Sequence, residues 1–392
     1  MTVANRSVER MRRTTVWLFA ATLLACGDAP AQGPAPRSPG PRSIDGAVRV
    51  ETVARGLVHP WGLALLPDGR MLVTERAGRV RIVERDGHLS APLAGVPAVY
   101  ARGQGGLLDV ALDPAFASNR VVYLSYSEPG SGGTAGTAVA RARLTDTGLQ
   151  DVRVIYRQEP KVVSSAHFGS RIVFRPDGTL FVTQGDRADY PRQAQDLSSG
   201  IGKIVRINPD GSIPRDNPFA GRNDARPEIW SYGHRNIQAA ALHPGTNQLW
   251  TVEHGARGGD ELNHPEAGKN YGWPVITYGR DYSGRSIGEG AVKAGMEQPV
   301  YYWDPVIAPS GMIFYTGDAF PGWKGSILVG GLTPGRLVRL TLVNGRVATE
   351  EQYLGDLGER IRDVQQGTDG TLYLITDSRE GRVLRVSPGS RR

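Results

Sequence analysis

One phrase recurs six times along the chain: a short apolar strand, a turn, and a second apolar strand. Three copies make the turn with Asp-Gly, and the fifth has an enlarged turn. Successive turns lie roughly fifty to seventy residues apart, the spacing of four-stranded blades that carry loop insertions. The six copies span residues 62–75, 108–125, 171–183, 239–252, 311–330 and 362–376.

This repeat predicts an all-β fold, a six-bladed β-propeller with four-stranded antiparallel blades. Alternating apolar positions would pack against neighbouring blades, and closure into a ring removes the long sheet edges that invite aggregation. We expect residues 48–52 to complete the blade that ends with residues 381–386. The 51 Gly and 27 Pro among 392 residues disfavour long helices. A two-sheet sandwich is the alternative for such a composition, but it would not repeat at this period.

The amino terminus has the organisation of an export signal. Four arginines precede a short apolar run at 15–24, which is too short to span a bilayer, and Leu-Leu-Ala-Cys follows. This sequence resembles the bacterial lipobox, whose cysteine is acylated, and Cys26 is the only cysteine, so no intrachain disulfide can form. An ordinary signal peptide with an incidental cysteine is the alternative. We predict a lipoprotein-type signal peptide at 1–26, a disordered Pro/Gly-rich tether at 27–45 and the propeller at 46–392. The protein would then be exported to the periplasm and anchored through Cys26.

Charge excludes one class of partner. The net charge of +7 is spread along the body, with no cluster of Lys and Arg interleaved with aromatic residues. Nucleic-acid binding is therefore not expected. Contact with a membrane is expected only through the lipid anchor.

Polar clusters fall between the repeats, where the loops of a propeller converge on one mouth of its channel. The densest runs from residue 234 to 274 and mixes His, Arg, Asn, Asp, Glu and Tyr with glycines. Glycines let backbone approach a ligand closely, and hard oxygen donors suit a hard cation. An oxyanion or quinone-like group held beside such a cation would suit this run. An irregular loop rich in turn-forming residues is the alternative.

Two groups of residues in these clusters suggest chemistry. His167 stands just before a strand and could act as a general base, with Asp186, after the next strand, to orient its ring. A histidine that merely caps its loop is the alternative. Arg235, Arg360 and Arg362 would converge on one mouth and imply an anionic ligand, because guanidinium groups match carboxylates. Surface ion pairs with Asp363 or Glu359 are the alternative for these arginines.

Eight short motifs lie in order along the body: H-P-W-G-L (59–63), G-Q-G-G-L-L (103–108), H-F-G-S-R (167–171), G-D (185–186), G-H-R-N (233–236), G-G-D-E-L-N (258–263), N-Y-G-W-P (270–274) and R-I-R-D (360–363). With these motifs the chain resembles the sugar dehydrogenases that depend on pyrroloquinoline quinone (PQQ), the family of soluble glucose dehydrogenase and bacterial aldose sugar dehydrogenase. The resemblance covers residues 57 to 386. It implies a six-bladed propeller, in agreement with the repeat.

The resemblance also implies an activity and roles for single residues. The activity is oxidation of an aldose sugar at C1 to the lactone, with PQQ and Ca²⁺ as cofactors. His167 would take the proton of the anomeric hydroxyl, Asp186 would support it, and Arg235 would stabilise charge on the quinone oxygen. The residues implied to hold PQQ are Gln104, Arg235, Asn236, Arg360 and Arg362. The carbonyl groups of Gly255 and Ala256 would bind the Ca²⁺ beside PQQ, and Glu261 and Tyr271 a second, structural one.

Some positions depart from the family pattern. Thr333 stands where the glucose enzyme has a PQQ-binding Lys, and Ala256 replaces a Pro. Residues 303–309 do not match the family's sugar-contacting residues, so the preferred sugar stays open and broad specificity is favoured. A quinone or a cytochrome would accept the electrons, and the protein would be a monomer or a homodimer. Two other readings remain open: a calcium-dependent lactonase, and a non-catalytic propeller that binds glycans or peptides.

Overall fold

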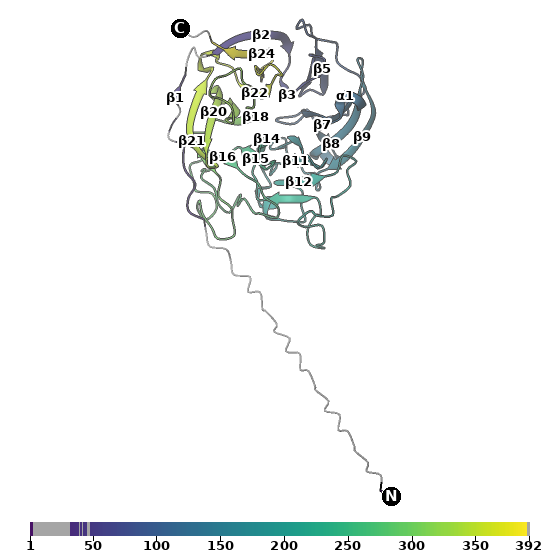
Figure 1. Ribbon diagram of the computed structural model, residues 1–392, viewed down its shortest axis with the longest axis vertical. Coiled ribbons are helices and arrows are strands. Elements are labelled where there is room, and N and C mark those ends of the chain that lie inside the picture. The colour runs from purple at the N-terminus through teal and green to yellow at the C-terminus, as the bar shows by residue number, and fades with distance from the viewer. Residues whose placement is uncertain (3–31, 39, 41, 45–47, 390–392) are drawn as a thin grey trace.

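The computed structural model describes residues 1–2, 32–38, 40, 42–44 and 48–389 (Figure 1). The predicted apolar run at 15–24 and Cys26 lie outside these residues. Within the described part of the chain, no helix is long and apolar enough to cross a membrane.

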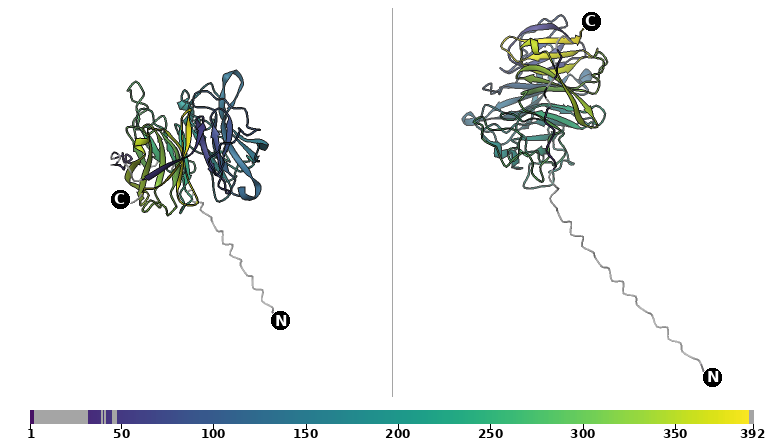
Figure 2. Two further views of the ribbon diagram at one scale, coloured as in Figure 1. Left: turned by 90° about the horizontal axis from the view of Figure 1, so that it is seen from above. Right: turned by 90° about the vertical axis from the view of Figure 1, so that its left-hand side faces the viewer.

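Six sheets are arranged around a central axis, so the predicted six-bladed propeller is confirmed (Figures 1 and 2). In chain order, the sheets are β3 (Pro60–Leu65), β4 (Met71–Glu75) and β5 (Arg79–Val83); β6 (Leu107–Leu112), β7 (Val121–Pro129), β8 (Ala135–Leu144) and β9 (Leu149–Arg157); β10 (Ile172–Phe174), β11 (Leu180–Thr183), β12 (Lys203–Ile207) and β13 (Ile229–Tyr232); β14 (Ile237–Leu242), β15 (Leu249–Glu253), β16 (Asp260–Asn263) and β17 (Tyr301–Trp303); β18 (Pro309–Phe314), β19 (Ile327–Leu332), β20 (Gly335–Val343) and β21 (Arg346–Tyr353), joined by β1 (Arg42–Ser43); and β22 (Ile361–Gln366), β23 (Leu372–Thr376) and β24 (Gly381–Pro388), joined by β2 (Val48–Leu57).

The ring is closed by its inner strands and by a seam between its ends. Strands β3, β6, β10, β14, β18 and β22 contact one another in that order, and β22 contacts β3. At the seam, β2 from the start of the propeller pairs antiparallel with β24 from its end. The predicted completion of the last blade by residues 48–52 is confirmed. Buried aliphatic and aromatic side chains between neighbouring blades form the core.

The first blade departs from the regular pattern of four strands. Its sheet holds only β3, β4 and β5. The chain after β5 still follows that strand, because Ser90 N–H donates to Ile82 O at 2.8 Å and Leu93 N–H donates to Val80 O at 2.9 Å. This fourth segment includes Pro92, which has no N–H to donate, so a regular ladder does not form.

The described residues of the segment predicted as a disordered tether lie against the propeller. β1 pairs in parallel with the edge strand β21, and Ser38 N–H donates to Tyr302 O at 2.8 Å. The Ser38 hydroxyl also donates to buried Glu350, at 2.6 Å. The outer edge of a blade offers unpaired backbone groups that such an extended segment can satisfy.

Helices are few among the described residues: α1 (Phe116–Asn119) and the 3₁₀ turns η1 (Ser131–Gly133), η2 (Pro191–Gln195) and η3 (Gly355–Leu357). The predicted site residues stand instead at strand ends. His167 and Asn236 precede inner strands, whereas Asp186 and Gly255 follow second strands. Because inner and second strands are antiparallel, these ends meet at one face of the ring.

Candidate active site

The predicted histidine–carboxylate pair is present at this face. His167 Nδ1 lies 2.6 Å from Asp186 Oδ1, and the side chains are 12% and 1% exposed. The other carboxylate oxygen of Asp186 accepts a hydrogen bond from Trp273 Nε1 at 2.7 Å. Both oxygens of the carboxylate are therefore fixed, and the imidazole ring is oriented by a partner that cannot rotate.

Backbone hydrogen bonds join this pair to the other predicted residues. His167 N–H donates to Gln104 Oε1 at 2.9 Å, and Asp186 N–H donates to the carbonyl of Arg235 at 2.8 Å. Asn236 Oδ1 accepts from Gly169 N–H at 3.2 Å, two residues after the histidine. Gln104, His167, Asp186, Arg235 and Asn236 therefore form one connected group.

Arg235 is buried, and its guanidinium is only partly paired. Its Nη1 donates to the carbonyl of His254 at 3.1 Å, while its Nε has no partner. The guanidinium carbon lies 5.3 Å from the ring centroid of Trp273, the residue that also binds Asp186. A buried donor without a partner is costly, so this nitrogen is suited to an acceptor on a ligand.

Arg360 and Arg362 also lie at this mouth, but neither pairs with Asp363 or Glu359, the alternative partners in the sequence. Arg362 Nη2 lies 2.5 Å from Asp377 Oδ2, and Arg360 Nη2 lies 3.7 Å from the same oxygen. Burial opposes ionisation of Asp377, but Arg362 outweighs it and holds the pKa of Asp377 below its ordinary value. Arg360 remains half exposed and available to a ligand.

A cavity of about 310 Å³ opens between these groups. Gln104, Asn236, Arg360 and Arg362 line it, and so do Phe168 and Gly169, which follow His167. Its size is at the lower end of the range for small-molecule sites. Two of the arginines predicted for an anionic ligand, Arg360 and Arg362, therefore meet at this cavity, and the third, Arg235, lines the adjoining small pocket.

The cavity is also lined by residues that the sequence did not assign to the site, among them His59, Trp61, Arg76, Gln238 and His254. His59 Nδ1 lies 3.0 Å from Asp377 Oδ1, so this histidine forms a second His–Asp pair. Burial lowers the pKa of His254 to about 3, and its neutral ring donates from Nε2 to the carbonyl of Pro309 at 2.6 Å. His59 and Arg76 stand in loops of the first blade, and this position in the sequence could have assigned them to the site.

The residues predicted to bind Ca²⁺ lie in the adjoining loop. Asp260 holds this loop, because one of its carboxylate oxygens accepts from Gly255 N–H at 2.8 Å. Gly255 is tightly enclosed, since a Cβ added there would lie 2.2 Å from the carbonyl oxygen of Gly258. The prediction used only the carbonyl groups of Gly255 and Ala256, and this backbone is held in place by the fold.

Glu261 and Tyr271 line a neighbouring small pocket with Glu253. Glu253 and Glu261 face each other across β15 and β16. Burial raises the pKa of Glu261 well above its ordinary value, and the charge of Glu253 adds to the effect. Asn263 Oδ1 is buried there without a partner. Tyr271 instead uses its hydroxyl to donate to the carbonyl of His264 at 2.7 Å.

Side chains alone do not make a metal centre in the described part of the chain, where no three His, Cys, Asp or Glu residues gather around one point. A cation here would need backbone carbonyl or amide oxygens as well. Thr333 follows β19, and its backbone N–H donates to Ile307 O at 3.2 Å.

Fold and site geometry together define a six-bladed propeller with a candidate active site for an anionic ligand at one mouth of its channel. The chain belongs to the glucose/sorbosone dehydrogenase family, whose model matches residues 57–385. It is therefore an oxidoreductase of the sugar dehydrogenase type.

Similar proteins agree with this assignment. The aldose sugar dehydrogenase YliI of Escherichia coli (strain K12) is 49% identical over 346 residues, which cover 87% of this chain and 93% of the relative. The apo-form crystal structure of the soluble aldose sugar dehydrogenase from Escherichia coli has a TM-score of 0.85 at 48% identity and covers 87% of this chain and 99% of that one. The PQQ-bound form of the Streptomyces coelicolor aldose sugar dehydrogenase has a TM-score of 0.71 at 31% identity, with coverage of 87% and 99%.

Proposed function

We propose that this protein oxidises aldose sugars at C1 to the lactone, with PQQ and Ca²⁺ as cofactors and His167 as the general base. The observation that carries the proposal is the fixed His167–Asp186 pair beside an arginine-lined cavity. The family assignment supports the substrate class, and the PQQ-bound relative supports the cofactor.

The tautomer of His167 follows from its hydrogen bond. Because Asp186 is a carboxylate acceptor at 2.6 Å, Nδ1 carries the ring hydrogen and Nε2 is left as the base. When Nε2 takes the proton of the anomeric hydroxyl, the ring becomes a cation beside the carboxylate. Asp186 stabilises that cation and keeps the ring in place, as in other histidine–carboxylate pairs.

The cavity fits a flat tricarboxylate such as PQQ. The Nε atoms of Arg76 and Arg362, which line it, are buried without partners, and so is the Nε of Arg235, which lines the adjoining small pocket. Carboxylate oxygens would satisfy them, with Gln104, Asn236 and Arg360 as further contacts. PQQ supplies a quinone that accepts the hydride from C1, and Arg235 would stabilise the negative charge that develops on its oxygen. Thr333 lacks the positive charge of a Lys, so we expect the affinity for PQQ to be lower by the contribution of that one contact.

The neighbouring pocket fits a calcium ion. Glu253 and Glu261 are buried next to each other, and Asn263 Oδ1 is an unused oxygen donor beside them. A divalent cation would offset the burial and the charge of Glu253, which together raise the pKa of Glu261. An ion bound here by Glu261 and Tyr271 would be the structural ion. The carbonyl groups of Gly255 and Ala256 would hold the ion that acts as a Lewis acid toward the quinone.

The proposal includes the location of the enzyme. The lipobox-like sequence at Cys26 supports export and a lipid anchor, which would keep the propeller at the periplasmic face of a membrane. A membrane quinone or a cytochrome is the class of electron acceptor that such a location offers. Labelling of the expressed chain with a radioactive fatty acid, lost in Cys26→Ser, tests the anchor.

Reconstitution tests the activity. The chain without its first 28 residues is mixed with PQQ and Ca²⁺, and reduction of an artificial dye by glucose and other aldoses is followed. We expect activity that needs both additions and falls about 100-fold or more in His167→Gln. Failure to bind micromolar PQQ would overturn the proposal.

A further inference from the structure

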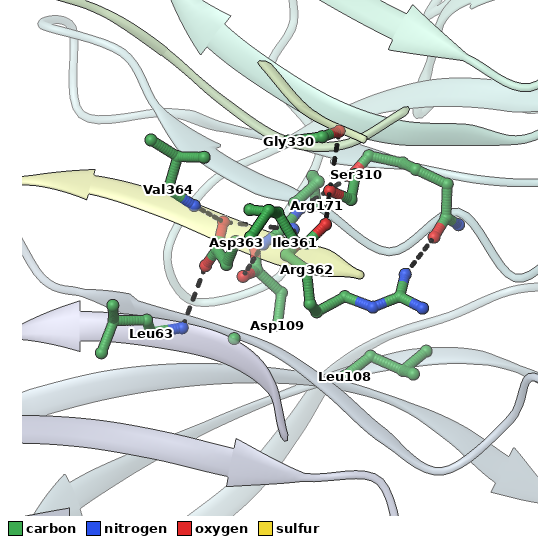
Figure 3. A network of polar contacts seen from close by, with 12 residues as sticks. Leu63, Leu108, Asp109, Arg171, Ser310, Gly330, Ile361, Arg362, Asp363 and Val364 are labelled. Atoms are coloured by element: carbon green, nitrogen blue, oxygen red, sulfur yellow. Dashed lines mark hydrogen bonds and ion pairs between the residues drawn. The ribbon is translucent and has the colours of Figure 1, made fainter. Parts of the chain in front are cut away.

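Beneath the cavity, Arg171 lies between two carboxylates in the centre of the ring. Its Nη1 is 2.9 Å from Asp109 Oδ1, and its Nη2 is 3.2 Å from Asp363 Oδ1. The three side chains are only 5%, 8% and 2% exposed. Figure 3 shows this group as one connected network. A second cavity, of about 370 Å³, opens on the opposite side of the group, so these side chains separate the two mouths of the channel.

Residues from all six inner strands meet at this group. Leu63 N–H of β3 donates to Asp363 Oδ2 at 3.0 Å, and Ile172 N–H of β10 donates to Asp109 Oδ2 at 2.8 Å. Asp109 belongs to β6 and Asp363 to β22, and β14 provides the carbonyl that accepts from Arg171 Nε at 2.8 Å. Gly311 of β18 lies so close to Asp363 that an added Cβ would be 2.1 Å from its Oδ1.

The same arginine reaches the wall of the active-site cavity. Its Nη2 donates to the backbone carbonyl of Arg362 at 3.3 Å, and its Nε to the backbone carbonyl of Gln238. The side chain of Gln238 accepts from Arg362 Nη1 at 3.3 Å. The Arg171 guanidinium also lies 4.3 Å from the ring centroid of Trp61, and that of Arg362 lies 5.9 Å from it. Arg362, Gln238 and Trp61 all line the cavity.

A stabilising role alone does not explain such a group. Two buried carboxylates share one guanidinium, so the group has an excess negative charge, and buried ion pairs of this kind often add little to stability. The ring is already closed by the pairing of β2 with β24. What the group does fix is the position of the backbone that carries Arg362.

We propose that Arg171, held by Asp109 and Asp363, is a positioning residue for the cofactor: it lies beneath the residues that line the cavity and orients Arg362, Gln238 and Trp61 toward the anionic ligand. The inference rests on the proposed function for the identity of that ligand. It assigns a role in binding to a motif residue, the last of H-F-G-S-R, that does not itself line the cavity.

The chain offers a matched control. Arg206 on β12 is also 5% exposed, lies between Asp177 and Asp216, and has its guanidinium 5.6 Å from the ring of Trp230. It lies outside the cavity. Arg171→Lys and Arg206→Lys therefore each remove a buried guanidinium group, one beneath the cavity and one away from it, although the carboxylates paired with Arg206 are exposed, at 41% and 75%.

The experiment measures PQQ affinity with Ca²⁺ by quenching of tryptophan fluorescence, and stability by urea unfolding. We expect both variants to lose stability, but only Arg171→Lys to raise the Kd for PQQ, about tenfold or more, because charged hydrogen bonds to the cavity wall are lost. The kcat at saturating PQQ should change far less than the Kd. An equal effect of the two variants on the Kd would overturn the inference.

A second measurement keeps the two proposals separable. In arginine-labelled apoprotein, the Nε–H signal of Arg362, assigned through Arg362→Lys, should shift in Arg171→Lys and stay in place in Arg206→Lys. This readout holds even if the wild-type chain fails to bind PQQ, a result that would overturn the proposed function alone. An unshifted signal overturns the positioning role. If Arg171→Lys does not fold, Asp109→Asn is measured in the same way against Asp177→Asn.

Discussion

At the scale of single residues, the site depends on side chains whose backbone is held by others. His167 has a φ of 51°, in the left-handed region that costs a residue with a side chain of order 1 kcal/mol or more. The hydrogen bond from its N–H to Gln104 helps to hold it there. The sequence suggested the pairing of His167 with Asp186, because both stand at the same end of one pair of strands. It could not suggest Trp273, which is 87 residues from Asp186.

The first prediction concerns the carboxylate of this pair. Asp186→Asn keeps the shape of the side chain but removes the charge that stabilises the protonated ring. We expect kcat to fall about 100-fold or more, with the Kd for PQQ unchanged. Dye reduction and fluorescence titration measure the two quantities. Asp189→Asn, at an exposed position of the same loop, is the control and should leave both unchanged.

The second prediction concerns pH and Asp109. Burial raises the pKa of Asp109 to about 6, with Arg171 opposing and Asp363 adding to the shift. In the unfolded chain this carboxyl group titrates near 4. Between about pH 4 and pH 6 the folded chain therefore holds a proton that the unfolded chain has lost, so this group's contribution to stability falls as pH rises.

Urea unfolding at pH 4, 5, 6 and 7 measures this dependence. Relative to Asp109→Asn, the wild-type free energy of unfolding should decrease as the pH rises through this window. Parallel pH profiles for the two proteins would show that Asp109 does not titrate there.

At the scale of strands and turns, the repeat could be recognised from the local sequence. Gly69, Gly178 and Gly370 end their Asp-Gly turns with φ values of 87°, 85° and 77°, a conformation that glycine adopts without strain. The inner two strands of each blade, which are mostly buried or half-buried and carry apolar runs, were predictable from the same local pattern. The irregular fourth strand of the first blade was not, because an outer strand needs no continuous apolar pattern.

Close packing of the inner strands gives the third prediction. Gly311→Ala should lower the free energy of unfolding by about 1–3 kcal/mol, because its Cβ would overlap Asp363, including Cα at 2.7 Å. Gly221→Ala is the control, since a Cβ there meets nothing within 4 Å. Urea unfolding of both variants measures the difference. Equal stability of the two would mean that β18 and β22 can move apart.

At the scale of the whole molecule, closure of the ring completes the cavity. His59 and Asp377 are 318 residues apart in the chain and lie 3.0 Å apart beside the seam formed by β2 and β24. The sequence places the two residues at opposite ends of the propeller, so no local pattern relates them. The alternative partners considered for Arg362, Asp363 and Glu359, do not pair with it, and its carboxylate partner is Asp377.

The central claim is that the closed propeller transfers a hydride from a sugar to a bound quinone. The most direct test mixes the protein, reconstituted with PQQ and Ca²⁺, with one equivalent of an aldose in the absence of oxygen and records the absorption spectrum of the cofactor. We predict full reduction of the bound quinone by the wild-type protein and reduction slowed about 100-fold or more in His167→Gln. A bound quinone that no aldose reduces would contradict the account.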